Sequence, residues 1–244
     1  MLAIIGGTGL SQLANLDVSR QQVVRTPYGE PSGPLTFGSI RGEPVVFLAR
    51  HGYGHTIPPH QVNYRANLWA LKEQGASAAV SVASVGGIRG DLGPGKIVIP
   101  HQIIDYTWGR MNTFFENEAP VKHIDFTEPY GAALRARLLA AAKACGEEVV
   151  DGAVYAAMQG PRLESAAEIN RLERDGADIV GMTGMPEATL AREIDLDYAA
   201  IAVVVNHAAG RGASARGIPL KEIEDVLEAA MHRVRSIIEA LTAP

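Results

Sequence analysis

The chain has 244 residues, 47% of them hydrophobic and 20% charged, which is typical of a folded globular protein with a sizeable core. A net charge of −5 without a dense Lys/Arg block argues against a nucleic acid polymer as the main partner. There is no apolar run of 18 residues and no basic segment at the start, so we expect neither a membrane span nor a signal peptide. The single cysteine, Cys145, fits a reducing compartment, and we expect a cytoplasmic protein with one domain over residues 1–244.

Short apolar runs predict strands, and apolar residues at helical spacing predict helices. The predicted strands are Leu2–Ile5, Leu35–Ile40, Pro44–Ala49, Ala78–Val85, Ile97–Ile99, Val149–Met158, Ala177–Val180 and Tyr198–Val205. The predicted helices are Gln61–Gln74, Pro129–Cys145, Ser165–Arg174 and Pro219–Leu241. The segments His101–Val121 and Ala208–Gly217 are expected to be irregular. This alternation predicts an α/β fold whose twisted, largely parallel or mixed sheet is covered by helices on both faces.

The stretch Ala78–Pro100 organises the chain. Its first part is apolar throughout, as in a strand buried on both faces, and it breaks at Gly86-Gly87. Such a strand end either turns a corner or leaves backbone N–H groups at Ala83–Gly86 free to bind a small anion. Both interpretations stay open from this stretch alone.

Other polar residues follow predicted strands and could meet at the same edge of the sheet. Gly7-Thr8-Gly9 follows the first strand and offers amide and hydroxyl donors. Arg50 and His51 follow the third, where a planar guanidinium and a neighbouring imidazole donor suit phosphate oxygens. Ligands of such sheets bind beyond strand ends, so a site for a phosphate group is predicted there.

Three other kinds of site lack support. The glycine turn has Gln12 at the third position of a dinucleotide fingerprint, which argues against an oxidoreductase of that type. The serines lack the nucleophile-elbow context of serine hydrolases. The seven histidines lack the spacing of a metal site, so no metal is expected.

Six motifs occur in the order found in one enzyme family. They are IIGGTGL (4–10), LARHG (48–52), VNYRANLWALKEQG (62–75), GGIRGDLGPGKIVIP (86–100), QGPRLES (159–165) and GMTGMPEATLARE (181–193). The chain resembles purine nucleoside phosphorylases of the trimeric type, and most of all their methylthioadenosine phosphorylase branch. The resemblance implies a barrel-like mixed sheet, a homotrimer, no cofactor besides the co-substrate phosphate, and phosphorolysis of a purine nucleoside at C1′.

Roles for individual residues also follow from the resemblance. The phosphate ligands would be Thr8, Arg50, His51, Ala83, Ser84 and Thr183, and the catalytic residues Arg50, His51 and Asn206. The nucleoside contacts would be Met182, Leu163, Glu164, Asn206, His207, Ala208 and Ile223. His123 would reach the site of a neighbouring subunit.

The sequence departs from the methylthioadenosine phosphorylase pattern at residues that are expected to contact the purine base. That branch has Asp in place of Asn206 and of Ala208, and Ser in place of Glu164, whereas inosine/guanosine phosphorylases have Glu and Asn as this chain does. An ionised Glu164 accepts the N1–H hydrogen bond of hypoxanthine but repels the N1 lone pair of adenine. The apolar residues Leu220, Ile223 and Val226 favour a methylthio group over a hydroxyl at the 5′ position.

The predicted substrate is therefore 5′-methylthioinosine. The alternatives are a methylthioadenosine phosphorylase, an inosine/guanosine phosphorylase, and a purine nucleosidase that uses water instead of phosphate. A purine sensor without catalysis is a further alternative on the same fold. The phosphate ligands argue against the last two, because neither hydrolysis nor sensing needs an anion site.

Overall fold

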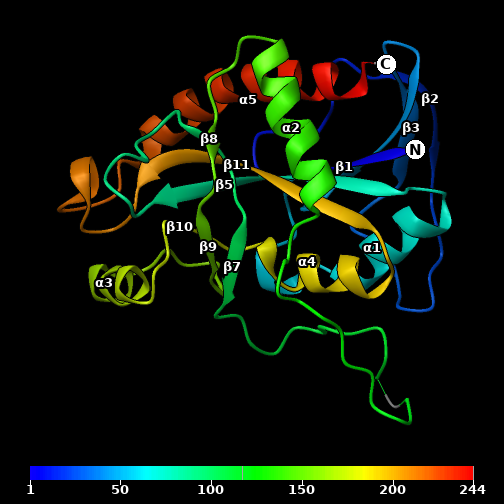
Figure 1. Cartoon of the computed structure of the whole chain (residues 1–244), viewed down its shortest axis with the longest axis horizontal. Coiled ribbons are helices and arrows are strands. Elements are labelled where there is room, and N and C mark those ends of the chain that lie inside the picture. The colour runs from blue at the N-terminus through cyan, green and yellow to red at the C-terminus, as the bar shows by residue number, and fades with distance from the viewer. Residues whose placement is uncertain (117, 244) are drawn as a thin grey trace.

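The computed structural model describes residues 1–116 and 118–243 (Figure 1). Eleven strands of this part of the chain form one mixed sheet. They are β1 (Leu2–Gly6), β2 (Asp17–Gln22), β3 (Leu35–Ile40), β4 (Glu43–Ala49), β5 (Ala78–Gly87), β6 (Ile97–Ile99), β7 (Gln102–Asp105), β8 (Val150–Asp151), β9 (Val154–Ala157), β10 (Ile179–Gly181) and β11 (Asp197–His207). The expected α/β fold with a mixed sheet flanked by helices is confirmed.

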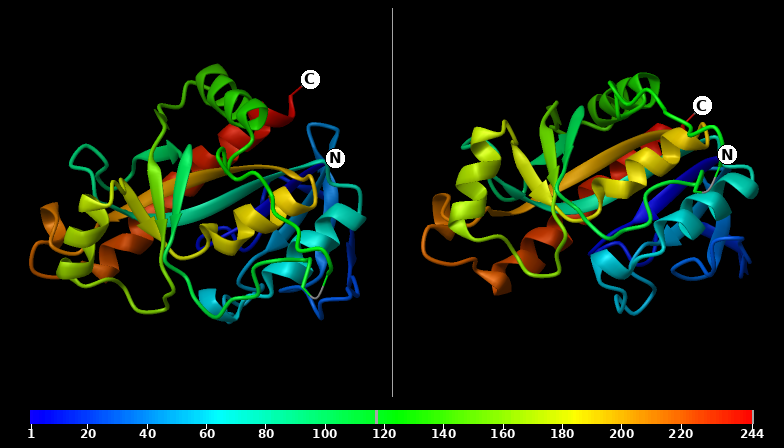
Figure 2. Two further views of the ribbon diagram at one scale, coloured as in Figure 1. Left: turned by 60° about the horizontal axis from the view of Figure 1, so that its bottom comes forward. Right: turned by 90° about the horizontal axis from the view of Figure 1, so that it is seen from below.

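Five α-helices of the described residues surround the sheet: α1 (Tyr64–Glu73), α2 (Ala132–Ala144), α3 (Ala166–Arg174), α4 (Gly184–Glu193) and α5 (Leu220–Thr242). Helices α2 and α5 pack together against β11 on one face, and α1 and α4 pack together on the other (Figures 1 and 2). Helix α3 lies at the end of the molecule, beyond β9 and β10 (Figure 1). Two short 3₁₀ turns, Pro59–Gln61 and Gly212–Ser214, complete the described elements.

Strand β5 is the centre of the sheet, as its apolar sequence predicted. It pairs in parallel with β1 along its first residues, in parallel with β11 along its whole length, and antiparallel with β10 at Gly86-Gly87. From β10 the sheet continues in parallel to β9 and β7, and from β1 it continues to β4, β3 and β2. The glycine pair therefore lies inside a strand that changes partners.

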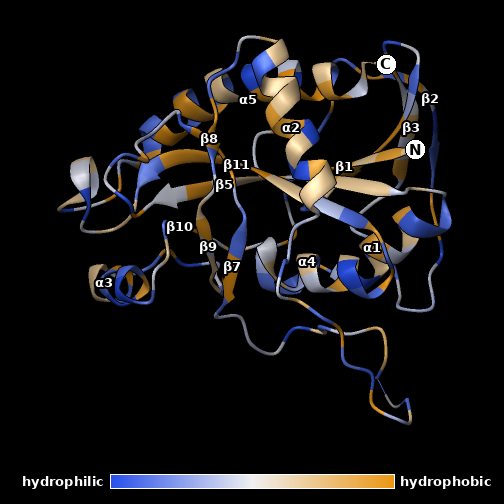
Figure 3. Ribbon diagram, in the orientation of Figure 1, coloured by the Kyte–Doolittle hydropathy of each residue, from blue (hydrophilic) through white to orange (hydrophobic). Residues whose placement is uncertain are grey.

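Alternating residues of the central strands point to opposite faces, and both faces are buried. In β5, Ala79 and Val85 belong to the core under α1 and α4, whereas Val80 and Val82 belong to the core under α2 and α5. The strands β1 and β11 alternate in the same way, and their ribbon has hydrophobic colours while the helices show both colours (Figure 3). This two-sided burial explains the continuous apolar runs in the sequence.

Several elements differ from the prediction. The strand expected over Val149–Met158 is two strands, because the chain turns at Gly152, whose φ of 89° is a left-handed conformation. Strand β2 has no apolar pattern because nearly all of it is exposed, and the short β7 lies in a segment expected to be irregular. Helix α4 is not among the predicted helices. None of the helices in the described ranges is long and apolar enough to cross a bilayer.

Candidate active site

A cavity of about 630 Å³ lies at the edge of the sheet where β1, β4, β5 and β11 deliver their carboxyl-terminal residues. These four strands are parallel to one another, so their ends meet at one edge. Strand β10 runs the opposite way along the end of β5 and returns Met182 and Thr183 to the middle of that strand. Twelve of the thirteen residues predicted for the site line this cavity.

The residues predicted to hold phosphate all line this cavity: Thr8, Arg50, His51, Ala83, Ser84 and Thr183. They come from four segments, after β1, after β4, within β5 and before α4. Arg50 is fully buried, and His51 and Thr183 are 6% exposed. The arrangement gathers a guanidinium, hydroxyls and strand-end amides around one small volume.

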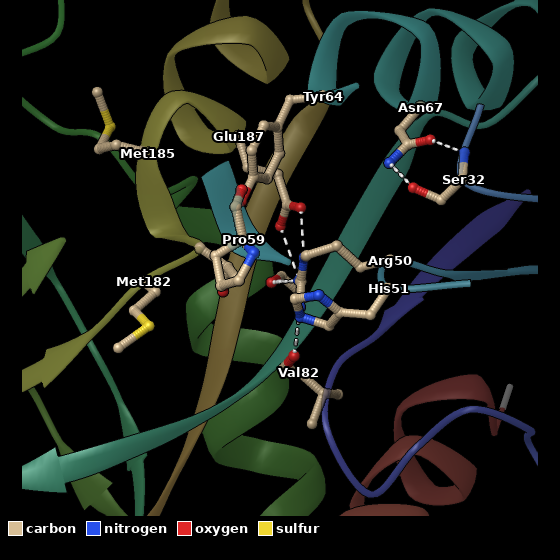
Figure 4. Close-up of polar contacts among 12 residues, drawn as sticks. Ser32, Arg50, His51, Pro59, Tyr64, Asn67, Val82, Met182, Met185 and Glu187 are labelled. Carbon is tan, nitrogen blue, oxygen red and sulfur yellow. Dashed lines mark hydrogen bonds and ion pairs between the residues drawn. The ribbon is translucent and has the colours of Figure 1, made fainter. Parts of the chain in front are cut away.

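Arg50 is held by a buried carboxylate. Its Nε donates to Oε2 of Glu187 at 2.7 Å and its Nη2 donates to Oε1 at 2.9 Å, and neither side chain is exposed (Figure 4). Burial acts to lower the pKa of the guanidinium, but the charge and hydrogen bonds of Glu187 outweigh it and raise this pKa above its usual value. The pair is bidentate, which fixes the guanidinium plane.

Few of the Arg50 hydrogen atoms remain for a ligand. Nη2 also donates to Ser81 Oγ at 2.6 Å, and Nη1 donates to the Val82 carbonyl at 3.0 Å. Of its five N–H groups, one on Nη1 stays available. That nitrogen lies against Gly7, where a Cβ atom would come 3.0 Å from it and 2.4 Å from the Val82 oxygen. Gly7 is therefore required for the close approach of the guanidinium to the cavity.

His51 is an acceptor at this site, in contrast to the expected donor. Its Nδ1 lies 2.8 Å from the Ile57 carbonyl, and because a carbonyl only accepts, Nδ1 holds the proton. Burial and the neighbouring charge of Arg50 lower the pKa of His51 to about 4, so the ring is neutral at pH 7. Its Nε2 is left to accept a hydrogen bond, for which a phosphate P–O–H group is a suitable donor.

Glu164 also lines the cavity and is half-buried. Helix α3 begins after it: Ser165 is the N-cap, and Glu168 accepts from the Ser165 N–H to close a capping box. Capping is thus done by Glu168, and Glu164 is not the first-turn helix carboxylate that a structural role would need. Burial raises the pKa of Glu164.

Asn206 reaches the cavity through a β-bulge. The pairing of β11 with β5 shifts between Val204 and Asn206, and both Val205 and Asn206 line the cavity. The Asn206 amide is 8% exposed, and its Nδ2 donates to the His207 carbonyl at 2.7 Å. This hydrogen bond orients the amide, because the opposite orientation would set two oxygens against each other.

The remaining predicted residues are distributed as follows. Met182, Leu163 and Ala208 line the cavity. At the start of α5 the cavity is lined by Ile218, Leu220 and Ile223, whereas the expected Val226 is not among its residues. His207 lies outside the lining and packs its ring against Gly93 and Gly212. His123 is exposed and also lies outside it.

Sequence reasoning missed the support of the site. Glu187 belongs to the motif GMTGMPEATLARE, which by itself indicates no role for it. Tyr198, whose hydroxyl donates to Glu187 Oε1 at 2.8 Å, lies in an apolar run that predicts only a buried strand. The segment His55–Pro59 forms a further wall of the cavity. A carboxylate on a helix face that is otherwise apolar was the one available indication for Glu187. Among residues 1–116 and 118–243, no three His, Cys, Asp or Glu side chains are grouped as metal ligands would be.

Comparisons with known proteins agree with this geometry. Residues 1–243 match the family model described as "Phosphorylase superfamily". The chain is 54% identical over 237 residues to a probable S-methyl-5′-thioinosine phosphorylase of Pseudomonas syringae pv. tomato, covering 97% of this chain and 96% of the relative. It is 41% identical over 245 residues to the 6-oxopurine nucleoside phosphorylase of Pyrococcus furiosus, covering 98% and 91%.

A solved structure is similar over nearly the whole chain. The methylthioadenosine phosphorylase of Schistosoma mansoni in complex with adenine superposes with a TM-score of 0.94 at 32% identity, covering 99% of this chain and 90% of that one. The fold, the order of the motifs and the sequence relatives lead to one assignment. The chain belongs to the phosphorylase superfamily and is an enzyme of the purine nucleoside phosphorylase type.

Proposed function

We propose that this enzyme cleaves 5′-methylthioinosine with inorganic phosphate to give hypoxanthine and 5-methylthioribose-1-phosphate. The observation that supports this substrate most strongly is the pairing of Glu164 and Asn206 in one cavity with an apolar wall from α5. Relatives at 54% and 51% identity are named probable S-methyl-5′-thioinosine phosphorylases.

Phosphate would bind between the ends of β1, β4 and β5. The free Nη1 hydrogen of Arg50, the hydroxyls of Thr8 and Thr183 and the backbone amide of Ser84 within β5 are the candidate donors, and Nε2 of His51 is the candidate acceptor. A phosphate oxygen held below C1′ stabilises the positive charge that develops on the sugar. It then forms the C1′–O bond while the C1′–N9 electron pair leaves with the purine.

The base would be a 6-oxopurine. One Asn206 N–H is used by the His207 carbonyl, the other can donate to O6, and Oδ1 can accept from a protonated N7. Adenine would need the amide turned over, and the hydrogen bond to the His207 carbonyl opposes that turn. Adenine would also place its N1 lone pair against Glu164. A buried mismatch of this kind costs about 1–3 kcal/mol per unpaired group, and two mismatches give roughly a thousandfold preference.

The 5′ substituent would lie against Ile218, Leu220 and Ile223. These side chains offer no hydrogen-bond partner, so a thioether fits them better than a hydroxyl. An inosine/guanosine phosphorylase remains the second candidate, because the relative from Pyrococcus furiosus is named a 6-oxopurine nucleoside phosphorylase at 41% identity. Activity on inosine equal to that on methylthioinosine would favour this candidate.

We further propose a homotrimer in the cytoplasm that needs no metal or organic cofactor, formed of one domain over residues 1–244, with His123 reaching a neighbouring subunit. The family match over residues 1–243 supports the single domain, and the lone Cys145 supports the reducing compartment. The mass in solution by light scattering tests the trimer. Activity after dialysis against a chelator tests the independence from metal.

The test of the reaction is the release of hypoxanthine from methylthioinosine with and without phosphate. The proposal expects release that depends on phosphate and a sugar phosphate product visible by ³¹P NMR. Equal release of hypoxanthine in phosphate-free buffer would mean that the enzyme catalyses hydrolysis and not phosphorolysis. Arg50→Ala should mainly raise the apparent KM for phosphate and lower turnover.

A further inference from the structure

Arg110 lies outside the cavity lining but holds the backbone of two segments that line it. Its Nη1 donates to the carbonyls of Met182 at 2.8 Å and Met185 at 2.5 Å. Its Nη2 donates to the carbonyls of Met158 at 3.2 Å and Gln159 at 2.8 Å. Its Nε donates to the Gln159 side-chain oxygen at 3.1 Å. All five N–H groups of the guanidinium therefore have an uncharged acceptor.

The topology explains why one side chain reaches both segments. Strands β7, β9 and β10 are parallel neighbours, and they end at one level, with Asp105 beside Ala157 and Ala157 beside Gly181. The chain after β9 leads to Leu163 and Glu164, and the chain after β10 leads to Met182 and Thr183. Arg110 follows β7 and spans the ends of the other two strands.

A third wall of the cavity packs against the same guanidinium through Tyr64. Nη1 of Arg110 lies 3.4 Å from the Tyr64 hydroxyl, which itself donates to the Pro59 carbonyl at 2.9 Å (Figure 4 shows Tyr64 and Pro59). The guanidinium lies 5.5 Å from the centre of the Tyr64 ring. Pro59 and its neighbours line the cavity.

We propose that Arg110 is a positioning residue that sets Glu164 and Met182 at the distance a 6-oxopurine nucleoside requires. Side chains must be held within a fraction of an ångström for such recognition, and residues 158–164 and 182–183 are loops with no strand pairing of their own. A guanidinium with carbonyl acceptors on two loops fixes their separation. The identity of the base and sugar rests on the proposed function, but the connection between the loops does not.

Loss of the Arg110 guanidinium should affect the kinetic parameters for the nucleoside and those for phosphate to different extents. Both segments contain nucleoside contacts, namely Leu163, Glu164 and Met182, whereas only Thr183 among the phosphate ligands lies in them. Loss of the guanidinium should therefore impair use of the nucleoside more than use of phosphate. It should also weaken the preference for the 6-oxo base, because Glu164 would no longer face N1–H.

The experiment compares Arg110→Ala and Arg110→Lys with Arg135→Ala. Arg135 is the control: it donates to the Pro100 and Ile99 carbonyls and to the Asp151 carboxylate, away from the cavity. Arg110→Ala should lower kcat/KM for methylthioinosine about ten- to a hundredfold and reduce the ratio of kcat/KM for methylthioinosine over methylthioadenosine. This ratio does not depend on how much enzyme is folded. Lys should restore little, because one ammonium cannot reach acceptors on both loops.

A second measurement needs no substrate. Hydrogen exchange of the ligand-free protein should become faster in residues 158–164 and 182–185 of Arg110→Ala, and stay unchanged there in Arg135→Ala. If Arg110→Ala only lowers the melting temperature, with an unchanged base ratio and unchanged exchange in both segments, the inference is wrong. If the wild type fails to cleave methylthioinosine with phosphate, the proposed function is wrong, and the exchange data still decide the role of Arg110.

Discussion

Arg50 and Glu187 form a buried bidentate ion pair in which the two oxygens of the carboxylate accept from Nε and Nη2 at 2.7 and 2.9 Å. The residues lie 137 positions apart in the chain, one at the end of β4 and the other in α4. The charge of Arg50 is therefore balanced inside the protein, and phosphate binding must rely on placed hydrogen-bond donors more than on a free cation. Tyr198 adds a third hydrogen bond to the carboxylate.

Removal of the carboxylate charge of Glu187 should lower the free energy of unfolding and raise the apparent KM for phosphate. Glu187→Gln leaves a buried guanidinium without a counter-charge, which typically costs about 3–5 kcal/mol of unfolding free energy. Because the guanidinium would also turn, the apparent KM for phosphate should rise. Chemical denaturation and initial rates measure the two effects. The control is Glu148→Gln, which breaks an exposed pair with Lys96 and should change stability by less than about 1 kcal/mol.

An unchanged melting temperature and phosphate KM in Glu187→Gln would show that Arg50 holds its place without Glu187. Loss of stability with a normal phosphate KM would assign the pair to folding alone.

Protonation of Glu164 should impair recognition of the base, and it should occur at a higher pH than protonation of an ordinary glutamate. Burial raises the pKa of Glu164, and its ionised form is a stronger acceptor from N1–H than its protonated form. As pH falls through this raised pKa, the carboxyl gains a proton and the charge-assisted hydrogen bond is weakened, so kcat/KM for methylthioinosine should fall on the acid side. The pH profile of kcat/KM at saturating phosphate measures this limb.

Glu164→Gln is the matched variant for that profile. Its amide oxygen still accepts from N1–H but does not titrate, so the acid limb should shrink while activity at pH 7 is partly retained. An identical acid limb in Glu164→Gln would mean that another group causes it.

The neutral state of His51 can be observed directly. A pKa of about 4, caused by burial and the neighbouring Arg50 charge, means that the ring stays uncharged at pH 5.5. The ¹H–¹³C NMR signal of His51, assigned with His51→Gln, should keep its neutral shift there. Because the folded-state pKa lies below the unfolded value near 6.5, this residue's contribution to stability is complete above pH 6.5 and declines as pH falls toward 4. A titration midpoint near 6.5 would contradict the neutral ring at pH 5.5 and, with it, an accepting Nε2 at that pH.

The sequence was informative where apolar runs end in polar residues. Strand β5, the buried runs of β1 and β11 and the residues Thr8, Arg50 and Asn206 at strand ends followed from that pattern. The roles of Glu187 and Arg110 could not be predicted from it. The partner of Glu187 lies 137 residues away in the chain, and the partners of Arg110 are backbone carbonyls, which no side-chain pattern reveals. The tautomer of His51 depends on the Ile57 carbonyl and was equally out of reach. Exposed β2 and the bulge before Asn206 lack any sequence pattern of their own.

If Glu164 and Asn206 determine the base preference, changing both residues should shift it from hypoxanthine to adenine. The double variant Glu164→Ser with Asn206→Asp should lower kcat/KM for methylthioinosine and raise it for methylthioadenosine, because Asp can accept from the 6-amino group and Ser can donate to N1. Each single variant should lose activity on methylthioinosine without a comparable gain on methylthioadenosine. A double variant with the wild-type preference would place recognition of the base elsewhere.

The most direct test of the account compares phosphate-dependent kcat/KM of the wild-type enzyme for methylthioinosine, methylthioadenosine and inosine. The account predicts that methylthioinosine is the best of the three, about a thousandfold better than methylthioadenosine and about ten- to a hundredfold better than inosine. If methylthioadenosine is the best substrate, the roles of Glu164 and Asn206 are wrong.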